Sequence, residues 1–108
     1  MKATVNDIEM YYEDTGEGTP LVLIHGQGGD ASEWSLFTPE VSKEVRCIAM
    51  DLRGHGQSDK PEQAYTQDLF ADDVAALLDF LQIDKAYMCG ISMGGFVALK
   101  MVLNHPEK

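Results

Sequence analysis

Three continuous apolar runs divide this chain of 108 residues. They span residues 21–25, 45–50 and 85–89, and each ends at a turn that is rich in glycine or polar residues. Short apolar runs bounded by turn residues are typical of strands buried on both faces. The pattern therefore predicts three central strands, each followed by a turn and a helix-like segment.

Two helices are predicted from the segments after these strands. Thr66 is a suitable N-cap for a long amphipathic helix. Its apolar stripe, which Asp73 interrupts, comprises Leu69, Val74, Leu77, Leu78 and Leu81. Residues 93–103 are apolar on nearly every side, so we expect this second helix to be buried. Asn104 and Pro106 should end it.

Shorter elements complete the predicted fold. Residues 3–13 indicate a hairpin of two strands around a turn at residues 6–7. A short helix, capped by Asp30 or Ser32, should follow the first central strand. It would contain Trp34, Leu36 and Phe37. Because strands alternate with helices, we expect an α/β fold: a mostly parallel sheet with helices on both faces.

The acidic composition narrows the classes of partner. Eighteen acidic residues against eight basic ones give a formal net charge of −10, so we expect neither nucleic acid nor a membrane surface as a partner. The N-terminus has no apolar segment typical of a signal peptide. Cys47 and Cys89 lie in apolar runs and are expected as buried small side chains, which favours a cytoplasmic location.

The segment Gly90-Ile91-Ser92-Met93-Gly94 carries the clearest candidate chemistry. A G-x-S-x-G sequence between a strand and a helix puts the serine on a strained turn, with its hydroxyl in a pocket. Side chains at the two glycines would collide with neighbouring elements. The Met93 amide would lie in the first turn of the helix, where it can stabilise a developing oxyanion.

The first glycine-rich turn, residues 26–31, has two interpretations. It fits the G-x-G-x-x-G/A dinucleotide fingerprint, and Asp51 stands near the offset of the acid that binds a ribose. The preceding hairpin, His25 and the second strand-turn-helix unit with its serine favour an oxyanion loop instead. Both turns follow strands at the carboxyl edge of the sheet, so the Gln27 and Met93 amides can converge on one oxygen.

Three motifs together resemble the α/β-hydrolase family. In order, they are His25-Gly26-Gln27-Gly28-Gly29, the sequence DLRGHGQS at residues 51–58, and GISMGG at residues 90–95. Within the family, the chain is most similar to small bacterial esterases, cofactor-free haloperoxidases and enol-lactonases. The resemblance implies strand order 1-2-4-3-5 with the second strand antiparallel. It also places Cys47 and Cys89 on non-adjacent strands, where no disulfide can form.

The resemblance also implies roles for individual residues. Ser92 would be the nucleophile, and the amides of Gln27 and Met93 would form the oxyanion hole. The structural positions of the motifs would be His25, Gly26, Gly90 and Gly94. The expected reaction is hydrolysis of small carboxylic esters or lactones through an acyl-enzyme, with no cofactor and no metal. A serine-dependent lyase is the nearest enzymatic alternative, while a serine nucleophile argues against epoxide hydrolase chemistry.

The family takes its catalytic acid and histidine from later strands, which residues 1–108 do not include. We therefore expect the N-terminal half of an α/β-hydrolase domain, inactive or weakly active alone. His25, His55 and His105 are expected to be structural, and Asp51 to pin the loop after its strand. The last strand would be an exposed apolar edge, and the sheet face near Trp34 would be poorly covered. A non-catalytic module that self-associates through this edge, as a swapped dimer, is the alternative.

Overall fold

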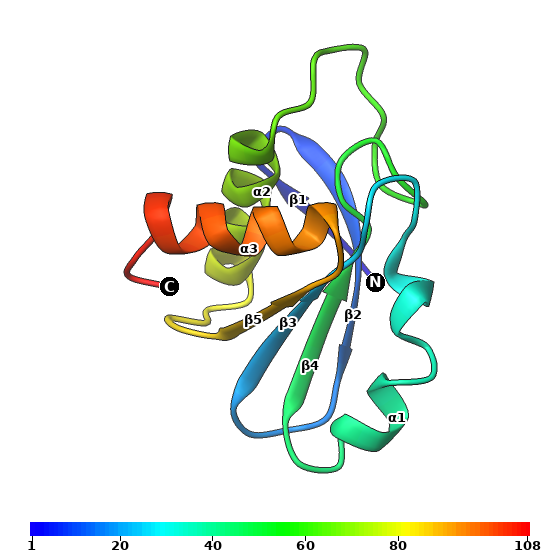
Figure 1. Cartoon of the computed structure of the whole chain (residues 1–108), viewed down its shortest axis with the longest axis vertical. Coiled ribbons are helices and arrows are strands. Elements are labelled where there is room, and N and C mark those ends of the chain that lie inside the picture. The colour runs from blue at the N-terminus through cyan, green and yellow to red at the C-terminus, as the bar shows by residue number, and fades with distance from the viewer.

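The computed structural model describes residues 1–108, and a five-stranded sheet forms its centre (Figure 1). The strands are β1 (Lys2–Val5), β2 (Ile8–Thr15), β3 (Pro20–Ile24), β4 (Arg46–Met50) and β5 (Tyr87–Gly90). They lie in the order β1-β2-β4-β3-β5. β3 pairs in parallel with β4 and β5, whereas β2 pairs antiparallel with β1 and β4. The strand order and the direction of β2 confirm the prediction.

The hairpin of β1 and β2 turns at Asn6 and Asp7, as predicted. Their φ angles are 45° and 68°, so both residues lie in the left-handed region. Two consecutive left-handed residues make a turn whose twist matches that of the flanking strands, and asparagine and aspartate tolerate this conformation well. The hairpin closes with Val5 opposite Ile8.

Helices lie on both faces of the sheet (Figure 1). α2 (Gln67–Phe80) and α3 (Met93–Asn104) cover one face, and η1 (Ala31–Trp34) and α1 (Thr38–Val41) lie at the other. Thr66 caps α2 as predicted, because its hydroxyl accepts a hydrogen bond of 3.0 Å from the Leu69 amide. No helix is long and apolar enough to cross a membrane.

The prediction of one short helix around Trp34 is wrong. The segment forms two separate elements, η1 and α1, and Leu36 between them is 92% exposed. Asp30 provides the cap of η1, with its side chain accepting from the Ser32 amide. Pro39 explains the division, because a residue without an amide hydrogen starts a helix more readily than it continues one.

The core has two parts, one on each face of the sheet. The larger cluster has 19 buried residues packed between the strands, α2 and α3. The smaller cluster lies beneath η1 and consists of Leu23, Ala31, Trp34, Cys47 and Ala49. Both cysteines are free, and β3 separates the strands that carry them, so the non-adjacent placement implied by the family is confirmed.

The expectation that α3 is buried all round is wrong. Val97 and Met101 point into the core, but the outer side of the helix is exposed. The exposed apolar residues of α3 are Phe96, Leu99, Val102 and Leu103. β5 is the last strand of the sheet and pairs only with β3, so no element of residues 1–108 covers this side. Tyr87 at the same edge is 70% exposed.

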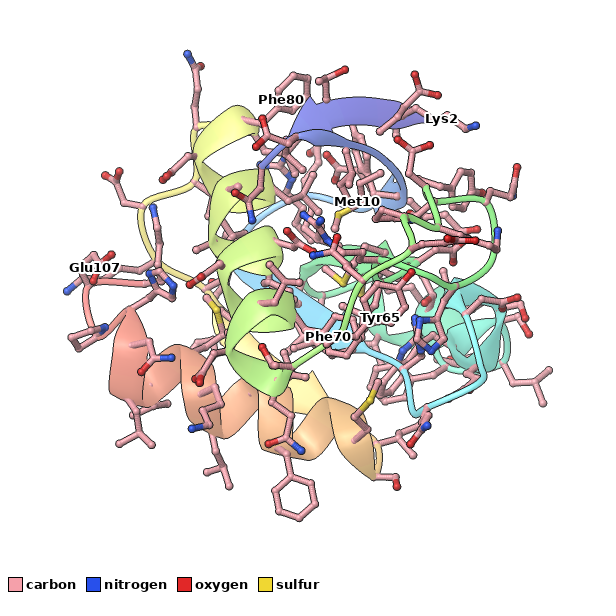
Figure 2. All side chains as sticks on the ribbon, turned by 90° about the horizontal axis from the view of Figure 1, so that it is seen from above. Lys2, Met10, Tyr65, Phe70, Phe80 and Glu107 are labelled. Atoms are coloured by element: carbon pink, nitrogen blue, oxygen red, sulfur yellow. The ribbon has the colours of Figure 1, made fainter.

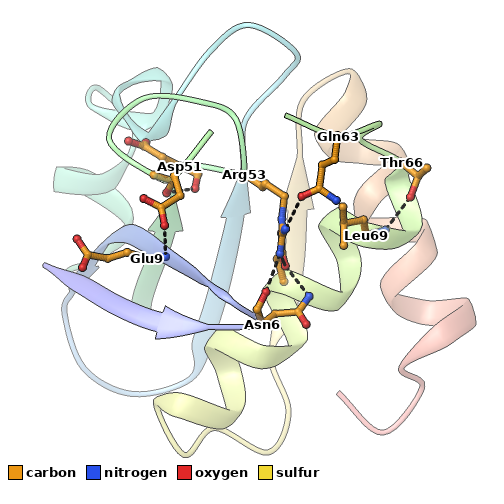
Figure 3. A network of polar contacts seen from close by, with 10 residues as sticks. Asn6, Glu9, Asp51, Arg53, Gln63, Thr66 and Leu69 are labelled. Carbon is orange, nitrogen blue, oxygen red and sulfur yellow. Dashed lines mark hydrogen bonds and ion pairs between the residues drawn. The ribbon is translucent and has the colours of Figure 1, made fainter. Parts of the chain in front are cut away.

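A buried ion pair anchors the loop after β4 to α2 (Figure 3). The guanidinium of Arg53 donates to both carboxylate oxygens of Asp73 at 2.9 Å, and these bonds raise the pKa of Arg53. Arg53 also donates to the side chain of Gln63 and to the carbonyl of Asn6. Asp73, which interrupts the apolar stripe of α2, is therefore a core residue whose charge is paired.

Candidate active site

Ser92 occupies the turn between β5 and α3. Its φ and ψ angles are 54° and −114°, a conformation that is strained for a residue other than glycine. The turn is held by hydrogen bonds from the Ile91 amide to the Ile24 carbonyl (3.1 Å) and from the Gly94 amide to the Ile91 carbonyl (2.8 Å). The backbone thus holds Ser92 in place while its side chain stays exposed.

Glycines allow the backbone to pack tightly around this turn. A Cβ atom at Gly90 would lie 2.1 Å from the Gly94 carbonyl oxygen, and Gly94 is itself buried against the end of β3. A Cβ atom at Gly26 would lie 3.6 Å from the Cβ of Ser92. The loop after β3 therefore passes directly beside the serine, and the two glycine-rich turns of the sequence meet in space.

An open cavity of about 700 Å³ lies where the two turns meet. Ser92, Met93 and Gln27 line it together. The amides of Gln27 and Met93 donate to no acceptor within the chain, whereas the neighbouring Gly29 amide donates to the Gly26 carbonyl. Two unpaired N–H groups in a cavity beside a hydroxyl can stabilise an oxyanion that forms on a bound carbonyl group.

His25 links the loop after β3 to the loop after β4. The ring is fully buried, its Nδ1 donates to the Gly26 carbonyl (2.7 Å), and its Nε2 accepts from the Leu52 amide (3.0 Å). Burial lowers the pKa of His25, since the charged ring would lose its water. Both nitrogens are occupied, and His25 does not line the cavity, so its part is structural.

Asp51 also links the loop after β3 to the loop after β4. One carboxylate oxygen accepts from the Ala31 amide and the other from the Gln57 amide, both at 2.7 Å. The side chain is buried, and both of its oxygens are held by main-chain amides of these loops and not turned towards a ligand. The dinucleotide-binding interpretation of the first turn therefore loses the acidic residue on which it relied.

His55 reaches the cavity, which sequence reasoning missed. It was expected only as a turn residue, but it lines the cavity with Ser92. Its Nδ1 donates to the Arg53 carbonyl (3.0 Å), and its ring lies 4.8 Å from that of His25. Gly54 and Gly56, with φ angles of 82° and 51°, turn the chain on either side and present the ring between them. The glycine-histidine-glycine sequence at residues 54–56 is the feature of the sequence that could have revealed the position of this ring.

The other candidate groups lie elsewhere. His105 follows the last turn of α3 and contacts Asp72 at 2.8 Å, at the opposite end of the helix from Ser92. No group of three or more histidine, cysteine, aspartate or glutamate side chains is arranged to hold a metal ion. Further cavity residues that the sequence did not reveal are Asp30, Tyr65, Gln67, Phe70 and Phe96.

Comparison with known proteins identifies the architecture. The family model described as the alpha/beta hydrolase fold matches residues 19–108. The chain belongs to the α/β-hydrolase family. A solved enol-lactonase from Burkholderia xenovorans LB400 matches this α/β-hydrolase chain with a TM-score of 0.95 and 35% identity, over 99% of this chain and 43% of that one.

Curated relatives match at higher identity. One is the dihydrolipoyllysine-residue acetyltransferase component of an acetoin cleaving system from Pseudomonas putida, 46% identical over 91% of this chain and 27% of its own length. Another is a 2-hydroxymuconate semialdehyde hydrolase from Pseudomonas sp. (strain CF600), 40% identical over 88% of this chain and 35% of its own length. The chain thus spans about a third of the length of these relatives.

Proposed function

We propose that this chain carries the nucleophile of a serine hydrolase that acts on small carboxylic esters or lactones. The observation that supports the proposal is the cavity shared by Ser92 and the unpaired amides of Gln27 and Met93. The Ser92 hydroxyl attacks the substrate carbonyl, and the two amides bind the oxyanion. The bond between the carbonyl carbon and the alkoxy oxygen then breaks, and that oxygen takes up the proton lost by Ser92. An ester releases a free alcohol, whereas an opened lactone keeps its hydroxyl on the acyl chain. Water then hydrolyses the acyl-enzyme and restores the Ser92 hydroxyl.

The substrate class is supported by the relatives and by the nucleophile. A related solved structure is an enol-lactonase, and a curated relative is a semialdehyde hydrolase. A hydroxyl nucleophile gives an acyl-enzyme that water can release, which suits esters and lactones. Epoxide opening in this family uses a carboxylate at the same turn, where this chain has Ser92.

We also propose that residues 1–108 are the N-terminal half of the hydrolase domain. The nucleophile needs a general base within hydrogen-bond reach, and neither His25 nor His105 can provide it. His55 lines the same cavity, but its one hydrogen bond goes to the Arg53 carbonyl and none joins it to Ser92. The chain covers 27–43% of the lengths of the relatives described above. The catalytic histidine and acid then come from later strands, and the isolated chain has only residual activity.

Fluorophosphonate labelling of the purified chain tests both statements, with Ser92→Ala as the control. Slow labelling that disappears in the variant, and that added imidazole accelerates, is the expected result because a free base replaces the absent one. Labelling that persists in Ser92→Ala would contradict the role of the serine. Rapid labelling without imidazole would contradict the proposed half-domain, since a base would then be present.

A second candidate function is a non-catalytic module that pairs through the edge of the sheet. The open edge of β5 and the exposed apolar side of α3 favour it. Sedimentation of the purified chain separates the two candidates, because a discrete dimer supports the module and larger aggregates do not.

For either function we propose a cytoplasmic location and small molecules, not nucleic acid or membranes, as ligands. The two free cysteines are consistent with a reducing compartment. The net charge of −10 disfavours polyanionic partners.

A further inference from the structure

The walls of the Ser92 cavity carry negative charge and no positive charge. Thirteen residues line the cavity, and they include one carboxylate, Asp30, but no lysine or arginine. The Asp30 Oδ1 accepts hydrogen bonds from the Ser32 hydroxyl and amide, which lower the pKa of Asp30. Its Oδ2 has no donor within the chain, so an ionised oxygen remains available to a ligand.

Aromatic rings and an imidazole nitrogen form much of the remaining wall. Tyr65 and Phe70 lie side by side, with ring centroids 6.0 Å apart (Figure 2), and Phe96 lines the cavity from α3. Ring faces attract cations. Nδ1 of His55 donates to the Arg53 carbonyl, which leaves Nε2 to accept a hydrogen bond, and Nε2 has no partner in the chain.

A carboxylate oxygen, an acceptor nitrogen and three aromatic rings all favour the same kind of group. Each attracts a cation that donates hydrogen bonds, and none compensates the charge of a carboxylate. The amides of Gln27 and Met93 do attract negative charge, but in the proposed reaction they bind the reacting carbonyl group and are not free to bind the substituent. The chain as a whole adds to this preference, because its formal net charge of −10 repels anions at longer range.

We propose that this cavity selects esters or lactones whose substituent carries a protonated amine, and that it disfavours substrates bearing a carboxylate. Asp30 is the residue that determines this preference. The inference rests on the proposed function, since it assigns the substrate to the cavity of Ser92. Asp30, His55 and the three aromatic rings all belong to residues 1–108, so the preference can be measured on this chain.

Three small methyl esters with different substituents test the preference: methyl 4-(aminomethyl)benzoate with its amine protonated, uncharged methyl 4-(hydroxymethyl)benzoate, and methyl 4-carboxybenzoate with its acid ionised. Each offers the same ester carbonyl to the amides of Gln27 and Met93, so the three probes differ in the charge of the substituent. Binding is followed by NMR on the ¹⁵N-labelled chain, through the amide signals of Gln27 and Met93, at low salt. We expect the ammonium ester to bind about three- to tenfold more tightly than the carboxylate ester, with the uncharged ester between them, as the screened unit charge of Asp30 would give. Raising the salt concentration should reduce this difference in affinity.

Asp30→Asn is the decisive variant, because asparagine keeps the oxygen that accepts from Ser32 but removes the charge. It should remove most of the difference in affinity between the ammonium ester and the carboxylate ester. Asp84→Asn changes the net charge equally at an exposed position outside the cavity and should leave the order intact. The proposal would be overturned if the carboxylate ester bound as tightly as the ammonium ester, if the order were unchanged in Asp30→Asn, or if no probe shifted the amide signals.

The Ser92→Ala variant shows whether a negative result concerns this inference or the proposed function. The charge preference does not depend on the hydroxyl, so the order of the three probes should survive in Ser92→Ala. Loss of the preference alongside Ser92-dependent fluorophosphonate labelling would refute the substrate class alone. A retained preference without such labelling would refute the nucleophile alone.

Discussion

The Cα atom of Gly94 packs against the carbonyl group of Ile24. A Cβ atom at Gly94 would lie 2.1 Å from the Ile24 carbonyl oxygen and 2.7 Å from that of His25. Both are main-chain atoms at the end of β3, so they cannot move aside as a flexible side chain would. This contact fixes the start of α3 against the strand whose loop carries Gln27, and it thereby sets the spacing of the two turns at the cavity.

Gly94→Ala should therefore destabilise the fold by about 1–3 kcal/mol, the range for forcing extra volume into a packed site. Urea unfolding of the purified variant measures the change. Gly95→Ala is the matched control in the same helix turn, because its Cβ would meet nothing closer than 3.7 Å. It should be neutral or stabilise by up to about 1 kcal/mol, as alanine favours helix. Equal stability of the two variants would refute the contact.

The pair of Arg53 and Asp73 is the second feature that should dominate stability. Asp73 is fully buried, so Asp73→Asn leaves a buried guanidinium without its counter-charge. Breaking a buried pair on one side costs about 3–5 kcal/mol. Asp68→Asn removes an exposed carboxylate 3.3 Å from Lys100, and such surface pairs contribute about 0–1 kcal/mol. Thermal or urea unfolding should separate the two variants clearly, and similar losses would contradict this assignment.

The sheet could be predicted because each of its central strands is a short apolar run. The observed β3 and β4 begin within one residue of the predicted runs, and β5 begins two residues later, at Tyr87. The burial of Asp73 could not be predicted in this way. Its partner, Arg53, lies in a loop that carries no periodic signal, so the sequence shows only a polar break in an apolar stripe.

The exposure of α3 and the place of His55 were missed for a related reason. An apolar pattern reports which side chains prefer burial, but the elements that lie beside them decide whether they are covered. Leu99 and Val102 are as apolar as the buried Val97, yet they face away from the sheet. His55 lines the cavity because loops from three parts of the chain meet there, which no local pattern encodes.

His25 makes the stability of the fold depend on pH. Burial depresses its pKa in the folded state, so the unfolded chain binds the proton more readily. The stabilisation from His25 is therefore complete above the unfolded pKa of about 6.5 and is lost as the pH falls below it towards the folded pKa. We expect the free energy of unfolding to fall between pH 7.5 and 5 through this residue.

His25→Gln tests this dependence, since glutamine can still accept from the Leu52 amide but does not titrate. The variant should be less stable at pH 7.5, because it loses the bond to the Gly26 carbonyl, and its stability should change less with pH. Urea unfolding at pH 7.5, 6.5 and 5.5 gives the comparison. His105→Gln, at the far end of α3, is the control. A pH slope in His25→Gln as steep as that of the unmodified chain would contradict the mechanism.

The uncovered side of α3 should make the chain self-associate. Of the twelve residues of α3, Lys100 alone is charged. The net charge of −10 therefore resides on other parts of the chain and does not prevent the apolar surfaces of two copies from meeting. Leu99→Glu puts a carboxylate in the middle of the apolar side and should shift the chain towards monomer in sedimentation velocity runs at increasing concentration. Leu36→Glu adds the same charge at a residue that is 92% exposed beside η1. It should associate like the unmodified chain, and an equal effect of both substitutions would show that total charge, rather than the α3 surface, controls association.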